Sequence, residues 1–276
     1  MVTRPLLRYH GGKFLLAPWI LEHLPAHRIY VEPFGGAASV LLTKSRSYAE
    51  VYNDLDGEIV NLFRIARDRG VELRAALELT PFAREEFVLS YAPSDDPLEQ
   101  ARRTAVRSFM GFGSNSLGKA SGFRACSNRC GTTPAHDWRN YPDALSGIID
   151  RLRGVVIESR DALLVMPAHD SPETLFYVDP PYVASTRDKG GDYRFEMTDE
   201  QHRALAELLH AVTGMVTLSG YRCELYDELY RDWTSIDRRA LADGARARIE
   251  TLWINPGCAA ALSRATAQRS LVLEVA

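Results

Sequence analysis

Long apolar runs are absent from this sequence of 276 residues. No stretch approaches the ~18 apolar residues that a membrane-spanning helix requires. Residues 1–8 lack the apolar core of a secretory signal peptide. Only four cysteines are present, and they are too scattered for a disulfide scaffold. These absences argue against membrane and secreted classes, so we expect a cytoplasmic protein with no membrane partner.

Net charge is also small, at −3, but it is unevenly distributed. Residues 102–139 hold seven basic side chains against the single acid Asp137, which gives +6 locally and −9 elsewhere. The basic residues are Arg102, Arg103, Arg107, Lys119, Arg124, Arg129 and Arg139. Such a block indicates contact with a polyanion. The interleaved Phe112, Phe123 and Trp138 favour nucleic acid, by backbone neutralisation and base stacking or wedging. A solvated surface is the ordinary alternative.

Apolar content of 46% and charged content of 25% are typical of a globular protein, and no internal repeat is present. Short apolar runs alternate with helical periodicity, which predicts an α/β fold. Strands are expected at 29–33, 48–52, 155–157, 175–178, 215–218, 234–237 and 249–254, the last two as an antiparallel hairpin. Helices are expected at 14–24, from the end of the glycine turn at 39 through 44, within 56–92, and at 98–109, 141–153, 199–212 and 224–231. Residues 111–140 have neither period and predict a long loop, and the tail from Cys258 has no clear pattern.

Three early motifs are typical of a nucleotide-binding unit. Tyr9-His-Gly-Gly-Lys13 allows close approach of a ligand to the backbone. Glu32-Pro-Phe-Gly-Gly36 is a glycine turn between a strand and a helix, and the next strand ends at Asn53-Asp54. An acid at that place can bind ribose hydroxyls. Because the three spaced glycines of the dinucleotide fingerprint are missing, pyrophosphate binding is not favoured.

Asp179-Pro-Pro-Tyr182 follows the apolar strand 175–178. Two prolines end the strand in a stiff turn, since neither can donate a backbone hydrogen bond. A carboxylate, a carbonyl and an aromatic ring therefore meet at the carboxyl end of a strand, where open α/β sheets bind ligands. This group suits the exocyclic amine of a flat ring. A buried acid in an ordinary turn is the structural alternative.

The order of these motifs, with a basic insert before Asp179, resembles the Dam-type DNA adenine-N6 methyltransferases over nearly the whole chain outside the insert. The resemblance implies a Rossmann-like, S-adenosylmethionine-dependent methyltransferase fold, with a mostly parallel seven-stranded sheet and a reversed edge strand. It also implies a catalytic domain of residues 1–65 and 150–276. Residues 66–149 would form an inserted target-recognition region, largely of helices and loops.

By this resemblance the protein methylates the N6 amine of a flipped adenine in double-stranded DNA. The expected contacts to S-adenosylmethionine are Tyr9 and Lys13, then Glu32, Phe34, Gly36 and Ala37 around its methionine portion, Asp54 at the ribose and Asp161 at the adenine. The expected catalytic residues are Asp179, Pro180, Pro181 and Tyr182. Asp179 and the Pro180 carbonyl would hold the amine, while Tyr182 would stack on the base. Ala38 is a departure, because the family often has a second glycine there.

The hypothesised DNA contacts are Lys119, Arg124, Arg129 and Arg139. A cognate restriction endonuclease is a conceivable partner, and no metal is required. Three alternatives stay open: cytosine-N4 methylation, protein-glutamine methylation, and an inactive DNA-binding relative. Cys126, Cys130 and His136 have something like the spacing of zinc ligands, but a fourth ligand is not evident and reduced thiols are the default.

Overall fold

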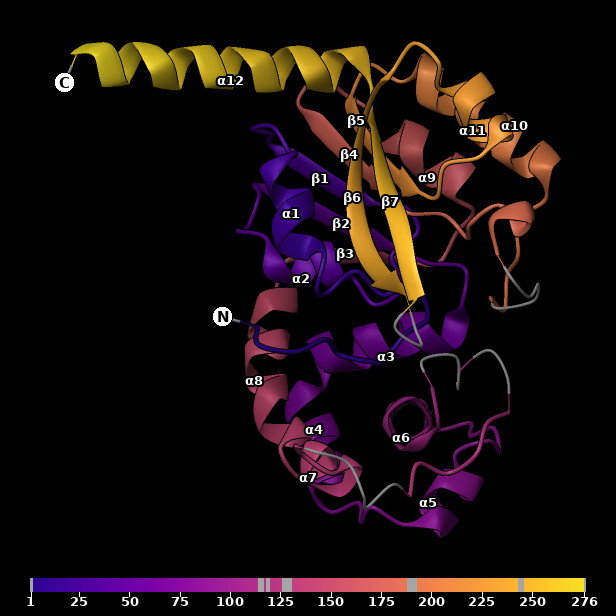
Figure 1. Cartoon of the computed structure of the whole chain (residues 1–276). Helices are drawn as coiled ribbons and strands as arrows, with labels where there is room; N and C mark the ends of the chain where they lie inside the picture. The colour runs from indigo at the N-terminus through magenta and orange to yellow at the C-terminus, as the bar shows by residue number, and fades with distance from the viewer. Residues whose placement is uncertain are drawn as a thin grey trace.

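A computed structural model of the chain describes residues 2–113, 117, 120–125, 131–187, 193–242 and 246–275. Of residues 240–242, 246–247 and 269–275 it describes the backbone alone. Figure 1 shows a sheet in one half of the molecule and a group of helices, α4 to α7, in the other. In the described part of the chain, no helix has the length and apolar character needed to cross a membrane.

The sheet has seven strands in the order β3-β2-β1-β4-β5-β7-β6. Their bounds are β1 Ile29–Glu32, β2 Ala49–Asn53, β3 Val155–Glu158, β4 Thr174–Val178, β5 Met215–Gly220, β6 Thr234–Ala242 and β7 Arg246–Ile254. The strands from β3 to β5 pair in parallel, whereas β7 is antiparallel to both β5 and β6. The expected fold class is confirmed, with the reversed strand inside the edge hairpin.

The two faces of the sheet build two hydrophobic cores. Along β4, Leu175 and Tyr177 join one core while Phe176 and Val178 join the other. This alternation follows from the two-residue period of a strand. Every residue of β4 is buried, as expected for a central parallel strand that helices cover on both faces.

The helices surround this sheet and fill the gap in sequence between β2 and β3. They are α1 Ala17–Glu22, α2 Ser39–Thr43, α3 Gly57–Asp68, α4 Gly70–Glu78, α5 Arg84–Leu89, α6 Pro97–Met110, α7 Pro134–Arg139, α8 Tyr141–Leu152, α9 Ala162–Ala168, α10 Asp199–Ala211, α11 Glu224–Leu229 and α12 Pro256–Val275, with a short 3₁₀ turn η1 Ala184–Thr186. Helix α3 packs against both α6 and α8. The 66–149 boundaries of a recognition region remain a prediction.

A buried cluster of charged residues connects helix α8 to the sheet. Glu50 on β2 accepts hydrogen bonds from Arg151 on α8, at 2.6 and 2.9 Å, and from Lys44 at 2.8 Å. All three residues are buried. Burial raises the pKa of Glu50, but the hydrogen bonds from Arg151 and Lys44 lower it more, so the net shift is downward.

Three sequence expectations need correction. Residues 111–140 are not one continuous loop, because α7 begins after a Thr133 cap, and Gly111 forms a β-bridge with Phe123. Helix α7 was not predicted, because a segment of six residues is too short to show a clear helical period. The unassigned tail is mostly helix α12, which starts on the sheet and projects from it (Figure 1). Helix α9 was not expected either.

Candidate active site

The strand order changes direction between β1 and β4. Strands β2 and β3 follow β1 on one side, whereas β5 follows β4 on the other. Such a switch point opens a crevice at the carboxyl ends of the strands. The pocket found here is lined by every expected cofactor residue and by two residues of the catalytic turn: Tyr9, Lys13, Glu32, Phe34, Gly36, Ala37, Asp54, Asp161, Asp179 and Pro181. The structure therefore brings together motifs that lie far apart in sequence.

Asp179 is held on one of its two carboxylate oxygens. Lys13 donates to Oδ1 at 3.0 Å, and Ser219 at the end of β5 donates to the same oxygen at 2.7 Å. Ser219 also shares a hydrogen bond of 3.1 Å with the Tyr177 hydroxyl. Among the described residues, both side-chain donors to Asp179 reach Oδ1. Oδ2 is thus the oxygen placed to accept from a ligand.

Tyr182 is buried and follows Pro181, which lines the pocket. Its hydroxyl donates a short hydrogen bond to Glu250 on β7, and its ring meets the edge of Tyr221 at 4.6 Å between centroids. The Lys13 ammonium lies over the same ring, 4.7 Å from its centroid. Stacking of a base on this ring would therefore require Lys13 to move.

The glycine turn after β1 is shaped by the aromatic rings around it. A Cβ on Gly35 would lie 2.2 Å from the Tyr52 ring, so no side chain fits. Gly36 has φ +46°, and a Cβ there would lie 2.9 Å from the Tyr9 ring. Asp54 closes the turn, because its carboxylate accepts from the Gly36 N–H and the Asp56 N–H, both at 2.8 Å.

Two carboxyls of the pocket wall have raised pKa values: Glu32 is buried, and Asp54 is half-buried. Burial raises the pKa of Asp54 to about 6, although backbone N–H groups oppose the shift. Burial likewise raises the pKa of Glu32 to about 7. Glu32 accepts from the Tyr30 hydroxyl and the Leu41 N–H, each at 2.6 Å. Glu32 thus fixes helix α2 to the end of strand β1 at the pocket wall.

The polar groups that line the pocket fit S-adenosylmethionine, which carries an ammonium, a carboxylate, a sulfonium and a nucleoside. Carboxylates of the wall suit its cationic groups and its ribose hydroxyls. Ser39 lines the pocket, and its buried hydroxyl has no hydrogen-bond partner among the described residues. Ala38 lies in the left-handed region, at φ 51° and ψ 36°, where glycine is preferred.

The expected DNA-binding residues are only partly described. Lys119 and Arg129 lie outside the described residues, as do Cys126 and Cys130 of the zinc alternative. Arg139 is exposed at the end of α7. Arg124 is 12% exposed and pairs with Asp137 at 3.4 Å. In the described part of the chain, no three His, Cys, Asp or Glu side chains gather as metal ligands.

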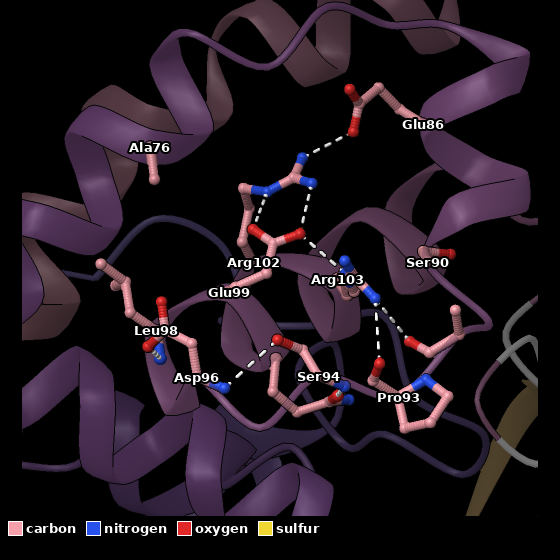
Figure 2. Close-up of polar contacts among 12 residues, drawn as sticks. Ala76, Glu86, Ser90, Pro93, Ser94, Asp96, Leu98, Glu99, Arg102 and Arg103 are labelled. Carbon is pink, nitrogen blue, oxygen red and sulfur yellow. Dashed lines mark hydrogen bonds and ion pairs between the residues drawn. The ribbon is translucent and has the colours of Figure 1, made fainter.

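The basic block is less available than its sequence suggests. Arg102 bonds to Glu99 and Glu86, and Arg103 bonds to the same Glu99 and to two backbone carbonyls (Figure 2). Arg107 pairs with Glu58. The local charge of +6 was counted without these acids, which lie outside residues 102–139.

Two aromatic residues of the block also have structural roles. Trp138 is buried and donates to the Thr80 carbonyl at 2.7 Å. Phe123 packs against Phe82 and Phe87. The expectation that Trp138 contacts bases is therefore wrong for the structure described, because its side chain is buried. Phe123 is half-buried and Phe112 is 60% exposed, so base contacts by these two residues stay a prediction.

Sequence analysis missed Ser219 and Glu250. Ser219 directly follows the predicted strand 215–218, at the same edge of the sheet as Asp179, and this position could have identified it. Glu250 is an acid in the apolar strand 249–254, and such an inward-facing acid needs a partner.

A pocket at this switch point, with a carboxylate beside a glycine turn, is typical of α/β proteins that bind a nucleoside cofactor. The family of D12 class N6 adenine-specific DNA methyltransferases matches residues 9–242. The chain belongs to this family, which confirms the resemblance seen in the sequence.

Curated relatives agree with the family over shorter segments. A DNA adenine methylase of Serratia marcescens is 38% identical over 67 residues, 24% of each chain. A DNA adenine methylase of Escherichia coli K12 is 34% identical over 108 residues, 36% of this chain and 38% of the relative. The matches thus span about a quarter and about two fifths of these relatives.

Proposed function

We propose that the protein transfers a methyl group from S-adenosylmethionine to the exocyclic N6 amine of adenine in DNA. The observation that carries this proposal is Asp179, held on Oδ1 by Lys13 and Ser219 at the switch point of the sheet. Family membership supports the same reaction.

The cofactor occupies the pocket between the turns after β1 and β4. Asp54 binds the ribose hydroxyls, Asp161 approaches the adenine, and Tyr9, Glu32, Phe34, Gly36 and Ala37 surround the methionine portion. Bound there, S-adenosylmethionine supplies an electrophilic methyl group on a sulfonium sulfur. Asp54 must then exchange part of its present bonding to Gly36 and Asp56 for ribose contacts.

Asp179 makes the target amine nucleophilic. The lone pair of an adenine amine is delocalised into the ring, so the nitrogen attacks poorly. Hydrogen bonds from its two hydrogens to Asp179 and to the Pro180 carbonyl favour a pyramidal nitrogen with a free lone pair. The positive charge that develops on nitrogen is stabilised by the preorganised carboxylate.

The target adenine leaves the duplex, since its amine cannot be reached inside the stack. Tyr182 offers the flipped base a stacking surface once Lys13 has moved from the ring face. Residues 66–149 recognise the DNA, with Arg124, Arg139, Lys119 and Arg129 as contacts. A cytoplasmic location and a restriction partner remain expectations.

Labelled S-adenosylmethionine incubated with unmethylated genomic DNA tests the proposal. We expect N6-methyladenine, by nucleoside analysis, at a short recurrent sequence. N4-methylcytosine in the DNA would contradict the proposal that adenine is the methylated base. Label in protein but not in DNA would instead indicate a glutamine acceptor.

A further inference from the structure

A second carboxylate lies beside the catalytic one. Glu250 is 3% exposed on β7 and contacts both Tyr182 and Lys13. It belongs to none of the motifs and lies beyond the matched residues 9–242. We propose that Glu250 is a positioning residue of the acceptor site, which fixes the Tyr182 ring and receives the Lys13 ammonium when the target amine occupies Asp179. This inference rests on the proposed function.

The first role concerns the phenol of Tyr182. Its hydroxyl donates to Glu250, while Tyr221 supports the ring from the side. A hydrogen bond to a carboxylate is stronger than one between neutral groups. Because Tyr182 is buried, loss of the acceptor would leave its hydroxyl without compensation. Glu250 therefore sets the plane on which the flipped base stacks.

The second role concerns the ammonium of Lys13. Its Nζ lies 3.0 Å from Asp179 Oδ1, 3.7 Å from Glu250 Oε1 and 4.7 Å from the Tyr182 ring centroid. Lys13 leaves Asp179 Oδ2 open for the target amine, but it covers the ring on which the flipped base is expected to stack. The incoming base must displace the ammonium. Lys13 is buried, so a displaced ammonium needs another carboxylate within reach, and Glu250 is that group.

Two substitutions test these roles. Glu250→Gln removes the charge that receives Lys13 and replaces the charge-assisted hydrogen bond from the phenol by a weaker neutral one. Tyr182→Phe keeps the ring but removes the link to Glu250. Single-turnover methyl transfer is measured for both variants, the double variant and the wild type. Exposed Glu207 on α10 provides the control Glu207→Gln. DNA with 2-aminopurine at the target position reports docking of the flipped base without any chemistry.

We expect Glu250→Gln to lower the single-turnover rate about tenfold or more, the effect of one lost charged hydrogen bond. It should also reduce the 2-aminopurine response, while Glu207→Gln changes neither. The fold-loss of rate in the double variant should be smaller than the product of the two single fold-losses, because both substitutions affect the hydrogen bond between Tyr182 and Glu250. A thermal melt of each variant shows whether it is folded.

A wild-type rate in folded Glu250→Gln, or a double variant whose loss equals the product, overturns the inference while leaving the proposed function intact. If Glu250→Gln does not fold, Tyr182→Phe decides, and a wild-type rate there overturns the inference. Absence of methyl transfer in the wild type would overturn the proposed function, and the inference with it.

Discussion

The ammonium of Lys13 lies 3.0 Å from the carboxylate of Asp179, although 166 residues separate them in the chain. This contact joins the Gly-Gly segment near the N-terminus to the turn after β4. Burial lowers the pKa of Lys13, but Asp179 and Glu250 raise it more, so the net shift is upward. Lys13 therefore stays charged beside the Asp179 carboxylate.

Replacing Lys13 by Met should slow methyl transfer by about 10- to 100-fold, because the carboxylates of Asp179 and Glu250 lose the cation that they share. Single-turnover kinetics at saturating cofactor measure this loss. Lys44→Met is the matched control, because Lys44 is also a buried lysine paired with a carboxylate, at 2.8 Å. That control should lower stability without slowing the folded enzyme. Equal losses of rate in the two variants would refute a specific role for Lys13.

Ser219→Ala removes the second donor to Asp179 Oδ1. We expect a rate loss of about tenfold with little change in cofactor affinity, because one hydrogen bond to a charged group is lost. The control is Thr217→Ser, two residues earlier on β5, whose hydroxyl contacts Cys258. Rates are compared at saturating DNA. An unchanged rate in Ser219→Ala would show that Asp179 is oriented by other groups.

The raised pKa of Asp54 makes stability depend on pH. Its pKa is about 6 in the folded protein, against 3.8 for the ordinary carboxyl. A raised folded pKa means stability that is full below the unfolded value and is lost as pH rises through the folded value. Relative to Asp54→Asn, the free energy of unfolding of the wild type should fall by roughly 1–3 kcal/mol between pH 4 and pH 7.

Urea unfolding of both proteins without cofactor, at several pH values, measures this difference. Other titrating groups, such as His202 with a pKa of about 4, are common to both proteins and cancel. A difference that stays constant from pH 4 to pH 7 would contradict the raised pKa of Asp54.

Exposed Arg139 should contact a DNA phosphate. Arg139→Ala is expected to weaken binding to all DNA sequences alike. It should also reduce the slope of the logarithm of the binding constant against the logarithm of the salt concentration by about one. Arg153, whose side chain is 73% exposed, is the control, since α8 separates the two residues by about 18 Å at 1.5 Å per residue. Fluorescence anisotropy at several salt concentrations measures both. If both variants kept the wild-type slope, Arg139 would not be a DNA contact.

Much of the sheet and of the pocket was predictable because strands and motifs depend on local pattern. The strand 175–178 and its Pro-Pro stop appear in the structure as β4 and the turn after it. Long-range pairing was not predictable from pattern. Glu99, Glu86 and Glu58 neutralise three arginines of the basic block, and Glu250 reaches Tyr182 from another strand.

Asp179→Asn provides the most direct test of the central claim that the Asp179 carboxylate activates the target amine. Single-turnover methyl transfer to DNA is measured beside S-adenosylmethionine affinity, the latter by calorimetry. The account predicts that N6-methyladenine formation falls by at least about 100-fold, while the cofactor still binds with near wild-type affinity. Methyl transfer at the wild-type rate by Asp179→Asn would contradict it.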